Sequence, residues 1–296
     1  AIQKYGTLVP MVHIRFAITY WLDVRAARTE SISRPNFTEV LPREEISQNS
    51  RIVRRGNATL DPTEAINYDL FLSAFNSKYG FLSFGGFYKK IDNLIFDRVA
   101  VVTDPASINL RPQTLGFDLF EPVNNPNKTT VNGFEFEWQS NFLFLPKPFS
   151  GLVVNANFTR IWSETQYPQF FLQRTSEGIV GVDTFRVGPM VNQPDFVANV
   201  SLGYDLNRFS SRISMVYQGS TLSAIGARPE TDSFTRDFNR FDASIKYSLL
   251  ENFDIFMNIL NINNQPDRSN QFTEQFPTFE EFSGWQTEAG IRYNLN

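Results

Sequence analysis

The stretch "FDASIKYSLLENFDIFMNIL", residues 241–260, alternates apolar and polar side chains with a period of two. In its first half Phe241 and Ile245 share one face while Asp242 and Lys246 share the other, and the alternation resumes after "LLENF". Successive side chains of a β-strand point to opposite faces, so the stretch predicts two strands joined by a short turn. Two environments suit such a sheet: a soluble fold with the polar face in water, and a membrane barrel with lipid outside and a wet interior.

Alternation of the same kind recurs along the chain. The further segments are "VHIRFAITY" (12–20), "LDVRAART" (22–29), "INYDLFLSA" (66–74), "FLSFGGFYK" (81–89), "GFEFEWQSNF" (133–142), "GLVVNANFTRIW" (151–162), "DFVANVSLGYD" (195–205), "RISMVYQ" (212–218) and "WQTEAGIRYNLN" (285–296). Together with the two strands above, they predict about eleven strands of about ten residues each.

The connections differ in length in a regular way. Short ones such as "YWL", "DLNR" and "LLENF" alternate with long ones at residues 31–64, 92–129, 164–192, 220–236 and 262–283. Outer-membrane barrels have short turns on one side and longer loops on the other, whereas a soluble sandwich has no reason to sort its loops in this way. Aromatic residues gather at the strand ends, as membrane-interface girdles require. These are Tyr20, Trp21, Tyr79, Phe142, Phe144, Tyr204, Phe253 and Tyr293. The pattern favours a membrane barrel.

Composition supports this interpretation. The 296 residues include 30 Phe, 10 Tyr and 4 Trp, or 15% aromatics. The mean hydropathy is nevertheless −0.27, and no apolar run reaches the length of a spanning helix. The absence of cysteine excludes a disulfide scaffold and thiolate metal sites, and a net charge of −4 does not suggest a nucleic-acid partner. The opening "AIQKYGTLVP" has no apolar signal region, so on the membrane interpretation we expect a mature or partial sequence.

An odd number of strands raises a question of completeness. Bacterial single-chain barrels have an even number, which puts both termini on the same side of the membrane. About eleven strands, the last of which follows a long loop, would start the first strand on the extracellular side. We therefore favour the back half of a larger barrel over a complete barrel in which one strand has escaped notice.

Two linked segments carry a family resemblance. "RAARTESISRPNF" (25–37) is followed by "GNATLDPTEAINYDL" (56–70), and the pair resembles the C-terminal barrel region of TonB-dependent outer-membrane transporters. Supporting segments follow in the family's order: "FYKKIDNLI" (87–95), "VNGFEFEWQ" (131–139), "NQPDFVANVSLGYD" (192–205), "RFDASIKYSL" (240–249), "NILNINNQP" (258–266) and "GWQTEAGIRYNLN" (284–296). Ala58 stands where the family usually has proline. The resemblance covers nearly the whole chain.

The physical role of the second segment is interpreted as structural. Gly56 and Asn57 suit a turn, and Pro62 stiffens the approach to the following strand. We expect the segment to shape the path from loop to strand rather than to touch a ligand.

The resemblance implies an all-β, antiparallel transmembrane β-barrel. Residues 1–296 would form the C-terminal part of a barrel of about 22 strands that closes around a plug. The plug domain, the TonB box and the signal peptide would be absent from this chain. The implied location is the cell outer membrane.

The implied function is TonB-dependent active uptake of a scarce nutrient, namely a siderophore, glycan, peptide or cofactor. The implied partners are the TonB complex, reached through the missing plug region, an extracellular small-molecule or oligomeric substrate, and outer-membrane lipid. One subfamily works with a surface lipoprotein, which no residue of this chain specifically supports. The resemblance implies no enzymatic activity, no bound cofactor and no nucleic-acid partner.

Charged residues of the polar strand faces would point into the lumen and toward the plug. They are Arg15, Arg25, Asp69, Glu135, Glu137, Arg212, Asp242, Lys246, Glu288 and Arg292. An equally good explanation is that they only solvate a wet interior, where each contributes little to stability.

Candidate ligand contacts lie in the long connections, because aromatic rings combined with arginine suit sugars, peptides and catechols. They are Trp162, Tyr167, Phe170, Phe171 and Arg174 in "RIWSETQYPQFFLQR", with Arg54 and Arg55 in "RIVRRG". Interface girdles and loop packing explain the same aromatics. Substrate identity is beyond the sequence.

Catalytic and metal chemistry find little support. His13 is the one histidine, and without a second His or Cys neither a catalytic pair nor a mixed metal site can be assembled. We expect no catalytic residue and no metal site. "GIVGVDTFRVG" (178–188) lacks the lysine and spacing of a phosphate-binding loop and is expected to be loop structure.

Two alternatives remain open. The first is a complete barrel of about twelve strands, either a passive porin or an autotransporter translocator. The second is a soluble β-sandwich binding module, which would be stable without detergent.

Overall fold

The computed structural model describes residues 6, 8–76, 78–176, 178–226 and 228–295; within β10 and β11 some side chains are left undescribed. Its main sheet has 12 strands, and all neighbours are antiparallel. Eleven of them follow one another in chain order: β1 (Met11–Thr19), β2 (Leu22–Ser33), β5 (Thr63–Asn76), β6 (Gly80–Asp92), β9 (Thr129–Asn141), β10 (Leu152–Thr175), β12 (Phe196–Leu206), β13 (Phe209–Gln218), β16 (Phe238–Leu250), β17 (Phe253–Leu260) and β20 (Gln286–Tyr293). All the strands predicted by alternation are confirmed.

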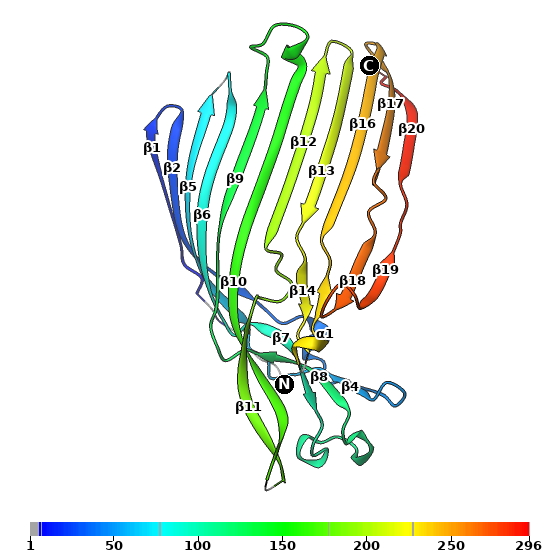
Figure 1. The fold of residues 1–296 in the computed structure, drawn as a ribbon. Helices are drawn as coiled ribbons and strands as arrows, with labels where there is room; N and C mark the ends of the chain where they lie inside the picture. The colour runs from blue at the N-terminus through cyan, green and yellow to red at the C-terminus, as the bar shows by residue number, and fades with distance from the viewer. Residues whose placement is uncertain (1–5, 7, 77, 177, 227, 296) are drawn as a thin grey trace.

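These strands form a single curved layer, called the wall below (Figure 1). Among the described residues β1 pairs with β2 alone and β20 with β17 alone, so the two edges of the wall do not meet. A closed barrel of this chain alone would need those edges paired, and a sandwich would need two packed layers. Both alternatives are therefore wrong, and the wall is a partial barrel.

The register gives the wall two different faces. Phe84, Phe136 and Phe158 stand directly opposite one another on β6, β9 and β10, with the rings of Phe136 and Phe158 stacked at 5.0 Å. One residue along each strand, Glu137 stands opposite Asn157 on the other face. An offset of one residue moves a side chain through the sheet, so alternation in the sequence becomes an apolar face and a polar face.

The two ends of the wall also differ. The turn end carries the short connections, shown at the top of Figure 1, and the loop end carries the long ones. Predicted girdle residues meet at the turn end, where the ring of Tyr79 lies 5.2 Å from that of Phe144 and Tyr204 lies 6.2 Å from Phe209.

The long connections contain strands of their own, which the sequence did not predict. The first loop sheet consists of β3 (Glu44–Ser47), β4 (Ile52–Arg55), β8 (Asp118–Asn124) and β7 (Ile95–Val101), in that order. The second loop sheet consists of β14 (Thr221–Ala224), β15 (Ser233–Thr235), β18 (Asp267–Gln271) and β19 (Pro277–Glu281).

A long hairpin projects from the same end (Figure 1). β10 runs on past its pairing with β9 and pairs with β11 (Gly178–Gly188) as far as Thr175. The expectation of loop structure at 178–188 is wrong, because the segment before it continues to alternate and turn residues appear only near its tip. Pro168 is tolerated where β10 has one neighbour instead of two.

The helices are short: α1 (Phe37–Val40) and the 3₁₀ turns Ala106–Ile108, Pro112–Thr114, Phe149–Gly151 and Pro229–Thr231. Across the described part of the chain, no helix has the length and apolar character needed to cross a bilayer.

Buried apolar clusters lie in the loop end. One consists of Val53, Val102, Leu110, Phe117 and Leu119 against one face of the first loop sheet. The other joins Phe96 of that sheet to Tyr167 of β10, Leu222 of β14 and Ile225, which directly follows β14. The three loop structures are therefore packed on one another.

Candidate functional site

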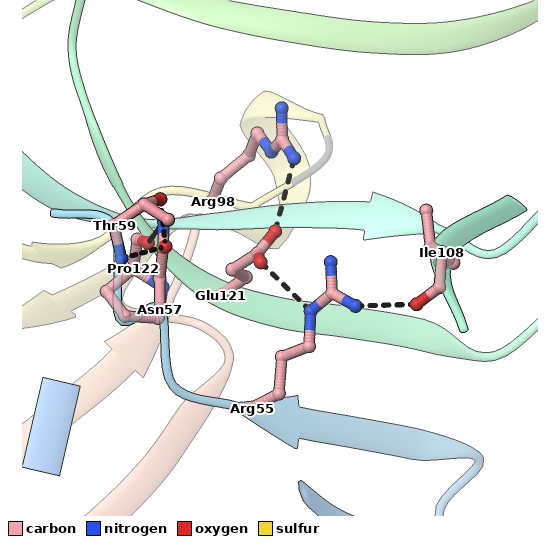
Figure 2. Close-up of polar contacts among 7 residues, drawn as sticks. All are labelled: Arg55, Asn57, Thr59, Arg98, Ile108, Glu121 and Pro122. Carbon is pink, nitrogen blue, oxygen red and sulfur yellow. Dashed lines mark hydrogen bonds and ion pairs between the residues drawn. The ribbon is translucent and has the colours of Figure 1, made fainter. Parts of the chain in front are cut away.

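The "GNATLDP" segment (56–62) packs closely against neighbouring backbone within the loop end. A Cβ atom on Gly56 would lie 2.0 Å from the carbonyl oxygen of Leu41, so only glycine fits there. The amide of Asn57 donates to the Pro122 carbonyl at 3.1 Å, and its side-chain oxygen accepts from the Thr59 amide N–H at 3.0 Å (Figure 2). These contacts support the structural interpretation of the motif.

Arg55 belongs to an ionic cluster within the first loop sheet. Its Nε donates to Glu121 Oε1 at 2.9 Å and its Nη1 donates to the Ile108 carbonyl at 2.9 Å, while Arg98 reaches Glu121 Oε2 at 3.3 Å (Figure 2). The Glu121 side chain is only 12% exposed. A carboxylate so shielded is strongly disfavoured unless paired, so Arg55 is committed to the fold rather than free for a ligand.

Arg54 points the other way, because adjacent residues on a strand face opposite sides. Its guanidinium lies 4.5 Å from the centre of the Phe120 ring on β8, directly opposite it in register. The side chain is exposed, and among the described residues no carboxylate lies within ion-pair distance of it. A guanidinium stacked on a ring keeps its N–H edge available for a planar anion.

A cavity of about 370 Å³ opens beside this stacked pair. Its lining includes Arg54 and Phe120 together with Thr38, Pro122 and Asp97. The volume lies within the range of small-ligand sites. Half of the twelve lining residues are charged, and the apolar part of the lining is formed by Leu41, Phe120 and Pro122.

Tyr167 is not available to a ligand. Its side chain is 0% exposed, and its ring packs edge-on against Phe96 at 5.1 Å. The hydroxyl donates to the Pro189 carbonyl at 2.9 Å and accepts from the Val191 amide N–H at 2.9 Å. Burial raises the pKa of the Tyr167 phenol above its usual value. The residue proposed as a ligand contact is thus a core residue of the loop end.

The other candidates on β10 occupy different surroundings. Trp162 lies at the boundary between wall and loops, 5.8 Å from the ring of Phe134 and 5.5 Å from the Arg160 guanidinium. This position fits an interface girdle better than a binding site. Arg174 is exposed near the hairpin tip, whereas the side chains of Phe170 and Phe171 lie outside the described residues. Phe170, Phe171 and Arg174 lie on β10 and not, as expected, in a loop, whereas Trp162 ends a segment that was predicted to be a strand.

Polar contacts fix the hairpin to the connection between β14 and β15 of the second loop sheet. Arg186 pairs with Asp232 at 2.7 Å, and the amide of Gln169 donates to the Gly226 carbonyl at 3.2 Å. Sequence reasoning missed Asp232, Phe120 and Glu121, because only the pairing of distant strands brings them to these positions.

The charged residues predicted to share a polar face do so. Residues that stand directly opposite each other on neighbouring strands lie on the same face of the sheet. Arg15 stands opposite Arg25, and Arg25 stands opposite Phe71. Phe71 stands opposite Gly85, which stands opposite Glu135, so Glu135 shares the face of the two arginines. Further strand pairs place the remaining ones on this face: Asp69, Glu137, Arg212, Asp242, Lys246, Glu288 and Arg292.

Two unpredicted carboxylates pair with this set. Asp23 lies 2.6 Å from Arg15 and 3.2 Å from Arg25, and Asp205 lies 2.5 Å from Arg212. His13 is exposed on the same face. Within the described ranges, no group of three or more metal-ligating side chains is arranged to hold an ion.

Comparison with known proteins agrees with this geometry. The family described as "TonB dependent receptor-like, beta-barrel" matches residues 1–262. A mutant of the ferric enterobactin receptor of Pseudomonas aeruginosa superimposes with a TM-score of 0.62 at 14% identity, over 96% of this chain and 40% of that one. The siderophore receptor PirA from Acinetobacter baumannii gives 0.61 at 14% identity, over 96% and 40%.

A third solved structure is a double mutant of the Serratia marcescens hemophore receptor HasR in complex with its hemophore HasA and heme. It gives a TM-score of 0.61 at 14% identity, over 96% of this chain and 39% of that one. The chain therefore spans about 40% of the length of these receptors. No curated protein matches significantly. The family match over 1–262 and the open, two-faced wall together show that the chain belongs to the TonB-dependent receptor β-barrel family.

Proposed function

We propose that the chain is the C-terminal part of the barrel of an outer-membrane receptor that takes up a scarce extracellular ligand by TonB-dependent active transport. The observation that carries the proposal is the family match to a wall with one apolar face, one polar face and all its folded loops at one end. At 14% identity the solved receptors support the fold alone, so their ligands do not transfer.

The apolar face would contact lipid and the polar face would line the lumen. The row of Phe84, Phe136 and Phe158 then lies against hydrocarbon, and the Glu135 row faces the interior. On this orientation the loop end is extracellular and the turn end periplasmic. The mouth of the receptor would be built by the two loop sheets and the hairpin.

The remainder of the barrel, the plug and the TonB-contacting segment would belong to the part of the receptor outside this chain. The fraction of the solved receptors that the chain spans supports this division. Arg15, Arg25 and the other charged residues of the polar face would contact the plug through ion pairs that can be broken during transport. No chemical conversion of the ligand is required.

Uptake measurements test the proposal. Deletion of the gene should abolish accumulation of the receptor's ligand, and deletion of TonB in an otherwise intact strain should abolish it equally, with the protein found in the outer-membrane fraction. Accumulation that persists without TonB would contradict active transport and favour a passive pore.

A further inference from the structure

The cavity on the face of the first loop sheet that carries Arg54 and Phe120 is lined by six charged residues, Glu39, Arg43, Glu45, Arg54, Arg55 and Asp97. Arg43 is paired with Glu45, Arg55 is paired with Glu121, and the Glu39 carboxylate accepts the backbone N–H of Asn36 at 2.8 Å. For Arg54 and Asp97, no ion pair or side-chain hydrogen bond to another described residue exists. Both line the cavity. One positive and one negative group are therefore left to face an occupant.

Strand pairing fixes the separation of these two groups. Arg54 on β4 stands opposite Phe120 on β8, and Asp97 on β7 stands opposite Pro122, two residues further along β8. Two strand spacings and a two-residue step put their Cα atoms about 12 Å apart. Phe120 and Pro122 lie between them and form an apolar floor.

A ligand that matches this arrangement has an anionic end, a cationic end and an uncharged body between them. An extended peptide of two or three residues spans about 7–10 Å, which is somewhat shorter than the separation of the two Cα atoms and leaves room for the two side chains. A carboxylate suits the free edge of a stacked guanidinium, and an ammonium suits an unpaired carboxylate. A neutral sugar would leave Arg54 and Asp97 without an ion-pair partner, and a purely anionic ligand would be repelled by Asp97.

We infer that this cavity binds a short peptide with free ends, its carboxylate on Arg54, its ammonium on Asp97 and its backbone over Phe120 and Pro122. The inference deepens the proposed function by naming a ligand class, and it rests on that function for the transport step. Binding itself is a property of the folded loop end and is measured separately.

The test uses the purified full-length receptor in detergent and isothermal titration with trialanine, N-acetyl-trialanine and trialanine amide. We expect trialanine to bind at least about tenfold more tightly than either capped form, because each cap removes one charged contact. Arg54→Gln should abolish the difference between acid and amide while keeping the difference between amine and acetyl. Asp97→Asn should do the reverse.

Matched controls separate recognition from folding. Arg51 also lies over an aromatic ring in the same loop region, 5.5 Å from Phe117, but does not line the cavity, so Arg51→Gln should leave all three affinities unchanged. Asp118→Asn on β8 serves in the same way for Asp97. Equal affinity for free and capped peptides, or equal losses in Arg54→Gln and Arg51→Gln, would overturn the inference. TonB-independent accumulation of a peptide that binds would instead overturn the proposed function and leave the site intact.

Discussion

The wall and the loop end of this molecule obtain their stability in different ways. In the wall each strand has one apolar and one polar face, and side chains such as Phe136 stand opposite their counterparts on the adjacent strands. In the loop end, residues far apart in sequence close around buried side chains such as Tyr167. The wall therefore depends on a period repeated along the chain, and the loop end depends on individual contacts. Single substitutions should act differently in the two regions.

The largest expected effect is in the loop end. Tyr167→Ala removes a fully buried ring from the junction of three loop structures and should cost about 3–5 kcal/mol of local stability. Hydrogen exchange measured by mass spectrometry should show faster exchange in β7, β11 and β14 and unchanged exchange in β12 and β13. Equal loosening of the wall strands would show that the two regions are one cooperative unit.

A pair of neighbouring substitutions tests the wall. Phe136→Arg places a charge on the apolar face and should cost about 2–4 kcal/mol, provided that this face contacts lipid near the bilayer midplane. Glu137→Arg, one residue along on the polar face, should change stability by less than about 0.5 kcal/mol. Urea unfolding in lipid vesicles measures both. Similar losses for the two variants would contradict the assignment of faces.

The predictability of the two regions follows the same division. The alternation at 241–260 and in the other wall segments predicted every wall strand, because a single-layer sheet with one apolar face and one polar face requires a period of two. β4 and β8 each have only a few residues and pair in parallel across more than sixty positions, so no local period marks them. Loop-end strands were accordingly missed.

Arg54 and Arg55 show why the candidate site was only half predictable. The sequence identified both as possible ligand contacts, but one residue of strand position separates a side chain stacked in an open cavity from one committed to Glu121. The two arginines can be told apart only once β4 is known to be a strand with one face packed against the rest of the loop end. Tyr167 failed for the same reason, since aromatic composition suits a binding site and a buried core equally well.

A smaller effect is expected from the ionic cluster of the first loop sheet. Glu121→Ala leaves the partly buried Arg55 without a charged partner, although its hydrogen bond to the Ile108 carbonyl remains, and should cost about 1–3 kcal/mol. Arg98 also loses its partner but adds little to this cost, because its side chain is half-exposed. Glu45→Ala breaks the exposed pair with Arg43 in the same sheet and should cost less than about 1 kcal/mol. Protease sensitivity of residues 95–124 compares the two. Equal sensitivity would mean that burial adds nothing to the Glu121 cluster.

The smallest effect should appear at alkaline pH, and it concerns the loop end alone. The pKa of Tyr167 is raised by burial in the folded protein, whereas a phenol in the unfolded chain titrates at about 10. Below about pH 10 the phenol is neutral in both states and stability does not depend on its titration. Above that value the unfolded state loses its proton first, so the loop end should lose stability as the pH rises toward the folded pKa.

Tyr167→Phe provides the comparison. The variant loses the two hydrogen bonds to Pro189 and Val191, which should cost about 1–2 kcal/mol at neutral pH. It also removes the contribution of this residue to the loss of stability at alkaline pH. Hydrogen exchange of β11 corrected for the intrinsic pH dependence would contradict the argument if both proteins lost protection equally between pH 9 and about pH 11.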